Sequence, residues 1–329
     1  MGSISTRLRS SVVTVAVCVT WFPPGLHGAS EASVPQIVVL TPHVGWRSME
    51  AGLQQGLREL GYVNGQNVHV EWRRPAGTHE SFGSLAVDSV RAKVDVFVTF
   101  ATPATRAALE VTTTVPVVFL VGDPVRSGFA DSLARPGGNA TGVSVVDTDL
   151  SAKRLELLRL CVPKAKRILY LMNSSNPLAP SMLKETENAA HSLGIALVSL
   201  DVRNADELDS ALQAILRSRE DAFLASPDPL FMANSARVTA VVRKAKLPGM
   251  FPFREYHEDG ALMSYGPNLK EVSRRMATYV DRILKGAKPA EMPIEQISTY
   301  ELLIDLRTAR TVGVTVPRDL VMRADELIR

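Results

Sequence analysis

The sequence predicts an α/β protein with two doubly wound parallel-sheet lobes joined by a hinge. Three observations lead to this fold class. Short apolar runs alternate with amphipathic segments, this alternation occurs twice along the chain, and a Gly- and Asn-rich turn at residues 135–139 leads into the strand that ends the first series. Alternating strands and helices are typical of parallel sheets that carry helices on both faces. The apolar fraction of 46% is sufficient for sizeable cores.

The first series begins after residue 34 with apolar runs that suit strands buried on both faces. Gly61 follows an amphipathic segment as a helix stop, and Pro103 suits the first turn of another helix. We expect strands at 36–40, 67–72, 94–100, 116–121 and 141–146, with helices at 46–60, 80–93 and 101–113.

The second series repeats this alternation. We expect helices at 150–161, 177–193, 205–217 and 228–246, with strands at 167–172, 195–200, 222–225 and 249–253. The last part of the chain differs, with a strand at 261–265, a helix at 269–285, a loop at 286–293, an apolar segment at 301–306 and two short helices. Two series of similar composition predict two similar lobes.

Residues 1–32 are predicted to be a secretory signal peptide. Arg7 and Arg9 precede an uncharged apolar run at 11–22, and residues 30–32 provide a small-x-small cleavage site. A membrane anchor is an alternative, but the run is shorter than the ~20 residues that a spanning helix needs. Lipidation at Cys18 is a second alternative. It is disfavoured because Val17 occupies the position before the cysteine, where a lipidation site requires a small residue. We therefore expect an exported protein that is periplasmic or extracytoplasmic.

Composition and motifs exclude several function classes. The net charge is +3, or +2 once the signal peptide removes two Arg and one Glu, and the basic residues are dispersed, so nucleic-acid binding is not expected. The sequence lacks G-x-S-x-G, H-E-x-x-H, phosphate-loop and dinucleotide-binding signatures. Cys161, the one Cys left after cleavage, is expected to be buried and inert. We expect no catalytic residue, no metal site and no cofactor, and we interpret residues 257–259 (His-Glu-Asp) as a solvated turn.

Polar residues of the first series follow strands at their carboxyl ends, where ligands bind in open α/β sheets. The loop at 101–105 opens a helix, and its free N–H groups, including that of Ala104, and the hydroxyls of Thr102 and Thr105 suit a carboxylate. Helix capping by Thr102 is the alternative role.

Three further candidates of the first series follow other strands. Thr41 and Trp46 follow the first strand, and Asp123 follows the strand at 116–121. Asp123 could bind a ligand ammonium or cap its own turn. An aromatic side chain such as Trp46 would suit a flat apolar ligand.

Candidates from the second series also lie at strand ends or near crossings between the lobes. Each has a structural alternative: the asparagines and Asp228 could cap helices, and Phe231 could pack its helix onto the sheet. The candidates are Asn173, Asn176, Asp228, Phe231, Glu255 and Tyr265.

Several stretches carry a family resemblance. They are GLRELGYVNGQNV (56–68), VPVVFLVGDPV (115–125), RPGGNATGVS (135–144), KRLELLRLCVPKAKRI (153–168), GALMSYGPNL (260–269) and the tail at 301–328. With these motifs the chain resembles bacterial ABC-transporter solute-binding proteins of the tryptophan/tyrosine-type family, which have a type 1 periplasmic-binding fold. The resemblance covers nearly all of the chain after residue 34.

The resemblance implies three crossings between the lobes, near 140–149, 260–268 and 291–299. Lobe 1 would comprise 34–145 and 262–292, and lobe 2 would comprise 146–261 and 293–329. The implied function is to capture a small organic solute and deliver it to an ABC permease. The solute would be an amino acid or a related carboxylate, with an aromatic one as an option. The protein would act as a monomer. A sensing subunit that presents its ligand to a receptor is the alternative, and an enzyme on the same fold is a weaker one.

Overall fold

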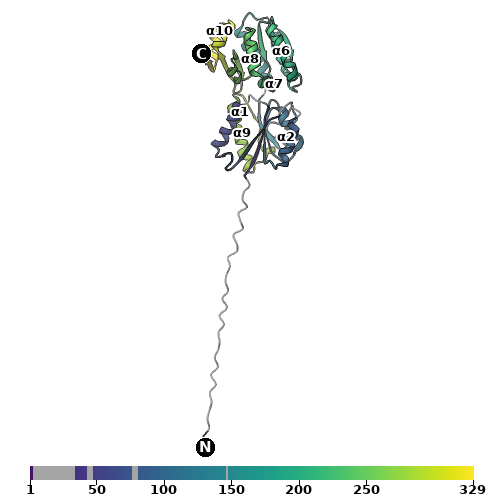
Figure 1. The fold of residues 1–329 in the computed structure, drawn as a ribbon, viewed down its shortest axis with the longest axis vertical. Coiled ribbons are helices and arrows are strands. Elements are labelled where there is room, and N and C mark those ends of the chain that lie inside the picture. Colours follow the sequence, from purple (N-terminus) through teal and green to yellow (C-terminus); the bar gives the residue numbers. More distant parts are fainter. Residues whose placement is uncertain (3–33, 43–46, 76–80, 146) are drawn as a thin grey trace. The chain divides into compact units, whose positions relative to one another are not determined.

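The computed structural model describes residues 1–2, 34–42, 47–75, 81–145 and 147–329. The predicted signal peptide, apart from its first two residues, and the candidate Trp46 lie outside the described residues. Residues Val34–Arg329 form one compact unit that contains two sheets (Figure 1).

The first sheet has six parallel strands in the order β11-β5-β4-β3-β1-β2. These strands are β1 (Gln36–Leu40), β2 (His69–Arg73), β3 (Val96–Phe100), β4 (Val117–Val121), β5 (Ala140–Ser144) and β11 (Glu295–Gln296). Its helices are α1 (Arg47–Glu59), α2 (Ser81–Arg91), α3 (Thr102–Val111) and α9 (Leu269–Leu284), with the short helix η2 (Pro289–Glu291). One core joins α1 and α9 to one face of the sheet, and another joins α2 and α3 to the opposite face.

The second sheet has seven strands in the order β13-β12-β10-β9-β8-β6-β7, with β10 and β12 antiparallel. The strands are β6 (Arg167–Met172), β7 (Ala196–Asp201), β8 (Ala222–Ala225), β9 (Gly249–Phe251), β10 (Met263–Gly266), β12 (Glu301–Asp305) and β13 (Glu326–Ile328). The helices are α4 (Asp147–Cys161), α5 (Ala179–Ser192), α6 (Ala205–Arg217), α7 (Pro229–Ala233), α8 (Ser235–Lys244), η1 (Arg254–Asp259), α10 (Leu306–Val312) and α11 (Arg318–Arg323). Helices α4, α5 and α10 pack on one face, while α6, α7 and α8 pack on the other.

The two doubly wound lobes confirm the predicted fold class. Strand β4 formed where it was expected because it is a short apolar run, and all five of its residues are buried. The expected helix at 228–246 is instead two helices, α7 and α8, which meet at Asn234. The tail adds the strand β13, which we did not predict.

The strand pairing moves two predicted lobe boundaries. Residues 262–266 were assigned to lobe 1, but β10 pairs with β9 and β12 in the second sheet. Residues 293–296 were assigned to lobe 2, but β11 pairs with β5 in the first sheet. The chain therefore crosses between the sheets after β5, after β10 and after β11. The buried side chains agree, because Met263 lies in the core of the second lobe and Ile294 in that of the first.

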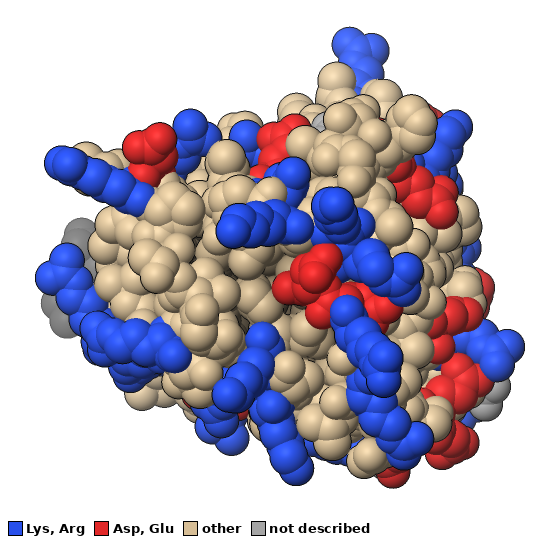
Figure 2. All heavy atoms as spheres, turned by 90° about the horizontal axis from the view of Figure 1, so that it is seen from above, with Lys and Arg blue, Asp and Glu red and all other residues tan. Residues whose placement is uncertain are grey.

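The surface carries charge of both signs. On the face shown in Figure 2, basic side chains are spread among acidic and uncharged ones rather than gathered in one patch. None of the described helices combines the length and apolar character needed to cross a membrane.

Candidate ligand-binding pocket

A pocket lies where the carboxyl ends of the two sheets face each other. Its wall includes Ala101 after β3, Gly122 after β4, Asn173 after β6 and Phe253 after β9. The cavity has a volume of about 150 Å³, roughly ten times the ~10–15 Å³ that one water requires. Most of the wall is apolar and comes from Pro103, Leu120, Val121, Val145, Pro177, Leu178, Met182, Pro227, Pro229, Phe253 and Leu269. This position and lining are typical of small-molecule sites.

The start of α3 forms the polar part of the first lobe's wall. Ala101 precedes the helix with φ 75° and ψ 154° and provides no side-chain cap. This backbone region is costly for any residue with a Cβ, by about 1–3 kcal/mol, and such residues cluster at functional sites. Thr102, the first residue of the helix, presents a free N–H, whereas Pro103 has no N–H to offer. The positive end of the helix dipole therefore lies at the pocket wall.

Thr102 adds a hydroxyl to this helix start. The residue lines the pocket and is only 8% exposed. Its hydroxyl has no hydrogen-bond partner in the described part of the chain. Thr102 does not cap the helix, which was the alternative role given above, because Ala101 occupies the N-cap position. An unsatisfied hydroxyl next to free N–H groups suits an anionic ligand group.

Ala104 and Thr105 lie behind the pocket wall. Both are fully buried, and neither lines the cavity. The Thr105 hydroxyl lies 2.8 Å from the Thr99 hydroxyl and donates to the Ala101 carbonyl at 3.1 Å. The Thr105 hydroxyl is thus used inside the lobe and supports the turn at Ala101, which corrects our expectation that it faces the ligand.

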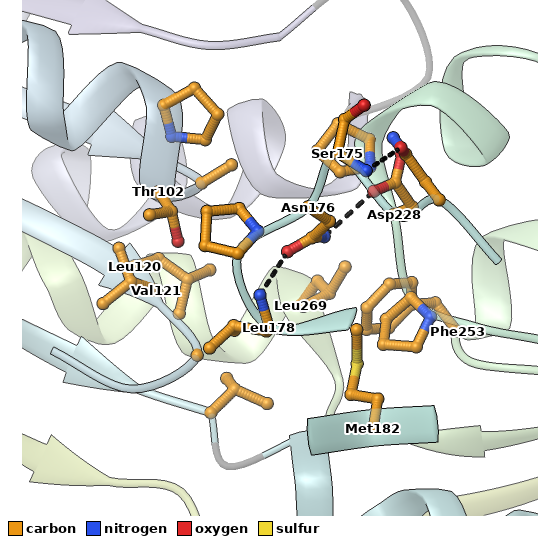
Figure 3. A pocket seen from close by; sticks show the side chains of 18 of the residues that line it. Thr102, Leu120, Val121, Ser175, Asn176, Leu178, Met182, Asp228, Phe253 and Leu269 are labelled. Carbon is orange, nitrogen blue, oxygen red and sulfur yellow. Dashed lines mark hydrogen bonds between the residues drawn. The ribbon is translucent and has the colours of Figure 1, made fainter. Parts of the chain in front are cut away.

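The second lobe contributes a hydrogen-bonded cluster centred on Asp228. Its carboxylate accepts from Asn173 Nδ2 at 3.2 Å and from Asn176 Nδ2 at 2.9 Å (Figure 3). It also accepts from the Leu230 N–H at 2.8 Å and so caps α7. The two amide oxygens accept from the N–H groups of Ser175 and Leu178. The capping role that we gave as the alternative therefore holds for Asp228, and Asn173, Asn176 and Asp228 all line the pocket as well.

Arg203 and Phe253 are two of the wall residues that were not among the sequence candidates. Arg203 follows β7, its side chain is 59% exposed, and its guanidinium pairs with Glu207 at 2.6 Å. Phe253 follows β9 and is buried. Both lie just beyond or at the end of an expected strand, which is the signal that could have found them. Among the described wall residues, Phe253 is the one aromatic side chain.

Four of the expected site residues contribute to the structure elsewhere. Thr41 is fully buried, and Phe231 lies in the core of the second lobe, the packing role that we gave as its alternative. Asp123 accepts from the Arg126 N–H at 2.9 Å and so caps its own turn. Tyr265 packs against the Tyr300 ring, with the two ring centroids 6.0 Å apart. None of the four lines the pocket as the described residues define it.

Glu255 lies at the junction between the lobes rather than in the pocket wall. Its carboxylate accepts a hydrogen bond from the Ser48 hydroxyl at the start of α1. Burial raises the pKa of this carboxyl, and the Ser48 hydrogen bond opposes the rise. A second contact between the lobes joins the Arg126 guanidinium to the Ser181 hydroxyl. These contacts hold the two lobes together beside the cavity.

The described titratable groups do not form a catalytic constellation at the pocket. Burial lowers the pKa of His257 to about 4, and the ring hydrogen-bonds Ser264 at 3.0 Å, so the expected solvated turn is wrong at this residue. Burial also raises the pKa of Cys161 to about 11, as expected for a buried inert thiol. Within the described ranges, no three His, Cys, Asp or Glu side chains are grouped so that they could hold a metal ion.

The fold and the pocket define a class: a two-lobed protein that can hold a small molecule between its lobes. Within that class, this chain belongs to the family of ABC transporter substrate-binding proteins, because the family model matches residues 35–328. The two lobes have the fold of type 1 periplasmic-binding proteins, as the resemblance implied.

This chain is similar to several known proteins, among them the following three. A tyrosine-binding protein from Clostridioides difficile is 24% identical over 276 residues, which cover 84% of this chain and 79% of that protein. The structure of an ABC domain from Streptococcus pneumoniae in complex with L-Trp has a TM-score of 0.82 at 25% identity, and the match covers 90% of this chain and 100% of that chain. A conserved domain protein from Vibrio cholerae has a TM-score of 0.83 at 27% identity, with coverage of 89% and 99%.

Proposed function

We propose that this chain is an exported solute-binding protein that captures an amino acid, or a related carboxylate with an apolar side chain, and delivers it to an ABC permease. One observation carries the ligand class: the free start of α3, with the unpartnered Thr102 hydroxyl, opens onto a pocket whose remaining wall is mostly apolar. A carboxylate is stabilised at a helix N-terminus by free N–H groups and by the helix dipole.

The rest of the wall supports an amphipathic ligand. Aliphatic residues and Phe253 suit an apolar side chain, and the amides of Asn173 and Asn176 can fix a polar head group. Both amides are oriented by Asp228 and so are ordered before a ligand binds. The names of the relatives that bind tyrosine and L-Trp favour the same class.

The transport role includes export and a permease partner. We infer that residues 1–32 are removed as a signal peptide and that the mature protein works as a periplasmic or extracytoplasmic monomer without catalysis. N-terminal sequencing of protein from the cell envelope should begin near Ser33. An intact Met1, or a lipid on Cys18, would contradict this cleavage.

A thermal-shift screen of the L-amino acids tests the ligand class. A ligand at 100 times its Kd stabilises the folded state by about 2.7 kcal/mol, or roughly 5 °C in Tm for a protein of this size. We expect a shift of this order from a subset of apolar or aromatic L-amino acids. The corresponding amines, which lack the carboxylate, are the control. No shift from any amino acid, or equal shifts from the amines, would refute the proposed ligand class.

A further inference from the structure

The pocket has an apolar side at Met182. In Figure 3 Thr102 lies on one wall beside Leu120 and Val121, whereas Ser175, Asn176 and Asp228 lie across the pocket from it, and Met182 lies at the lower end near Phe253. An amino acid that places its carboxylate at the start of α3 would direct its side chain toward the apolar side. Residues there decide how large that side chain can be.

Met182 extends into the pocket from α5. The residue is 2% exposed, and its side chain points from the helix into the cavity toward Phe253 (Figure 3). Its carbonyl accepts the Thr186 hydroxyl at 2.7 Å, one turn further along α5. The backbone of Met182 is therefore held by the helix while its side chain forms part of the cavity wall.

The neighbours of Met182 are fixed more firmly. Leu178 lies against the backbone of Gly122 in the other lobe, where an added Cβ would come 2.5 Å from the Leu178 Cδ1 atom. Leu120 and Val121 belong to β4, which has a paired strand on each side. Met182 has an unbranched side chain with three rotatable bonds. Of these wall residues, it is the one that can be shortened with the least disturbance to either sheet.

We propose that Met182 determines specificity by setting the largest side chain that the pocket accepts. The inference rests on the proposed amino-acid ligand. Shortening Met182 to Ala removes three heavy atoms from the wall and leaves space that only a larger ligand can fill. A contact of the size of one methylene changes affinity by about fourfold, so the change should favour L-tryptophan over L-leucine by at least about tenfold.

Calorimetry with L-leucine, L-phenylalanine and L-tryptophan tests this inference on four proteins. They are the wild type, Met182→Ala, Met182→Leu, which conserves volume, and Met276→Ala, which removes a buried helical Met outside the pocket wall. We expect the ratio of the L-leucine Kd to the L-tryptophan Kd to rise about tenfold or more in Met182→Ala. It should stay near the wild-type value in Met182→Leu and Met276→Ala.

Each other outcome has a distinct meaning. Binding of these amino acids with an unchanged ratio in Met182→Ala, or an equal change in Met276→Ala, overturns the role of Met182 and leaves the proposed ligand class intact. Absence of binding by every protein, the wild type included, overturns both. If Met182→Ala fails to fold, Met182→Phe replaces it. The bulkier side chain should lower the ratio of the L-leucine Kd to the L-tryptophan Kd. An unchanged ratio in Met182→Phe would refute the inference.

Discussion

Thr102 and Thr105 lie within one turn of α3, yet their hydroxyls have different surroundings. The Thr102 hydroxyl lies at the pocket without a partner in the described chain, whereas the Thr105 hydroxyl is bonded to Thr99 and to the Ala101 carbonyl. Thr102→Val should weaken ligand binding by about one to two decades, because a hydrogen bond to a charged group contributes about 1.5–3 kcal/mol. Its unfolding free energy should change little.

The matched variant Thr105→Val should behave in the opposite way. It removes a buried hydrogen bond and should lower the unfolding free energy by about 1–2 kcal/mol, with little direct effect on affinity. Calorimetry and urea unfolding of both variants check the pair. If Thr105→Val lost affinity and kept the wild-type unfolding free energy, the Thr105 hydroxyl would contact the ligand instead of stabilising the lobe.

His257 predicts how stability depends on pH. Burial lowers the pKa of the folded protein's His257 to about 4, while an unfolded His titrates near 6.5. Between these two pKa values His257 binds a proton in the unfolded chain but stays neutral in the folded protein. The free energy of unfolding therefore falls as the pH falls from about 6.5 to about 4. At pH 5 the loss relative to pH 7 should be about 2 kcal/mol.

Urea unfolding at pH 7 and pH 5 measures this contribution. His257→Gln should show a smaller loss of unfolding free energy on acidification than the wild type. His191→Gln is the matched control, because it makes the same substitution at an exposed position of α5. Equal losses in all three proteins would mean that His257 does not resist protonation.

At the scale of elements, the contact between α1 and α9 builds the first lobe from distant parts of the chain (Figure 1). A Cβ on Gly56 would lie 2.3 Å from the Arg274 carbonyl oxygen, and one on Gly52 would lie 2.1 Å from that of Lys270. Gly56→Ala should therefore force the two helices apart and destabilise the protein by about 1–3 kcal/mol or more.

Gly83 in α2 is the matched control, because an added Cβ there would meet no atom within 4 Å. Gly83→Ala should stabilise the protein by about 0.4–1 kcal/mol through the entropy of the unfolded chain. Thermal or urea unfolding of the two variants gives the comparison. Similar changes of the same sign would show that the close helix contact has no energetic consequence.

The elements were largely predictable because their signals are local. Buried strands such as β4 and β8 are continuous apolar runs, and the run at 116–121 differs from β4 by one residue at its start. The position of Met182 at the pocket could not be predicted, because it depends on contact between lobes built from distant segments. The turn at Ala101 gave no signal either, since a positive φ is usually marked by glycine. Thr102 was predictable because it follows a strand and opens a helix.

At the scale of the whole molecule, three crossings join the lobes, and the contacts Ser48–Glu255 and Arg126–Ser181 connect them beside the pocket. A ligand that touches both walls should favour the closed arrangement. Small-angle scattering should then show a smaller radius of gyration when the amino acid that gives the largest thermal shift is added. Identical profiles with and without saturating ligand would count against hinge closure.

We expect the pocket between the lobes to bind a carboxylate at the start of α3. Calorimetry with that same amino acid and with its carboxamide tests this claim most directly, because the pair differs only in the charged group. We predict that the amino acid binds one molecule per chain and that the carboxamide binds at least about tenfold more weakly. Equal affinities for the two compounds would contradict the carboxylate site, and the absence of binding by every amino acid would contradict the proposed function itself.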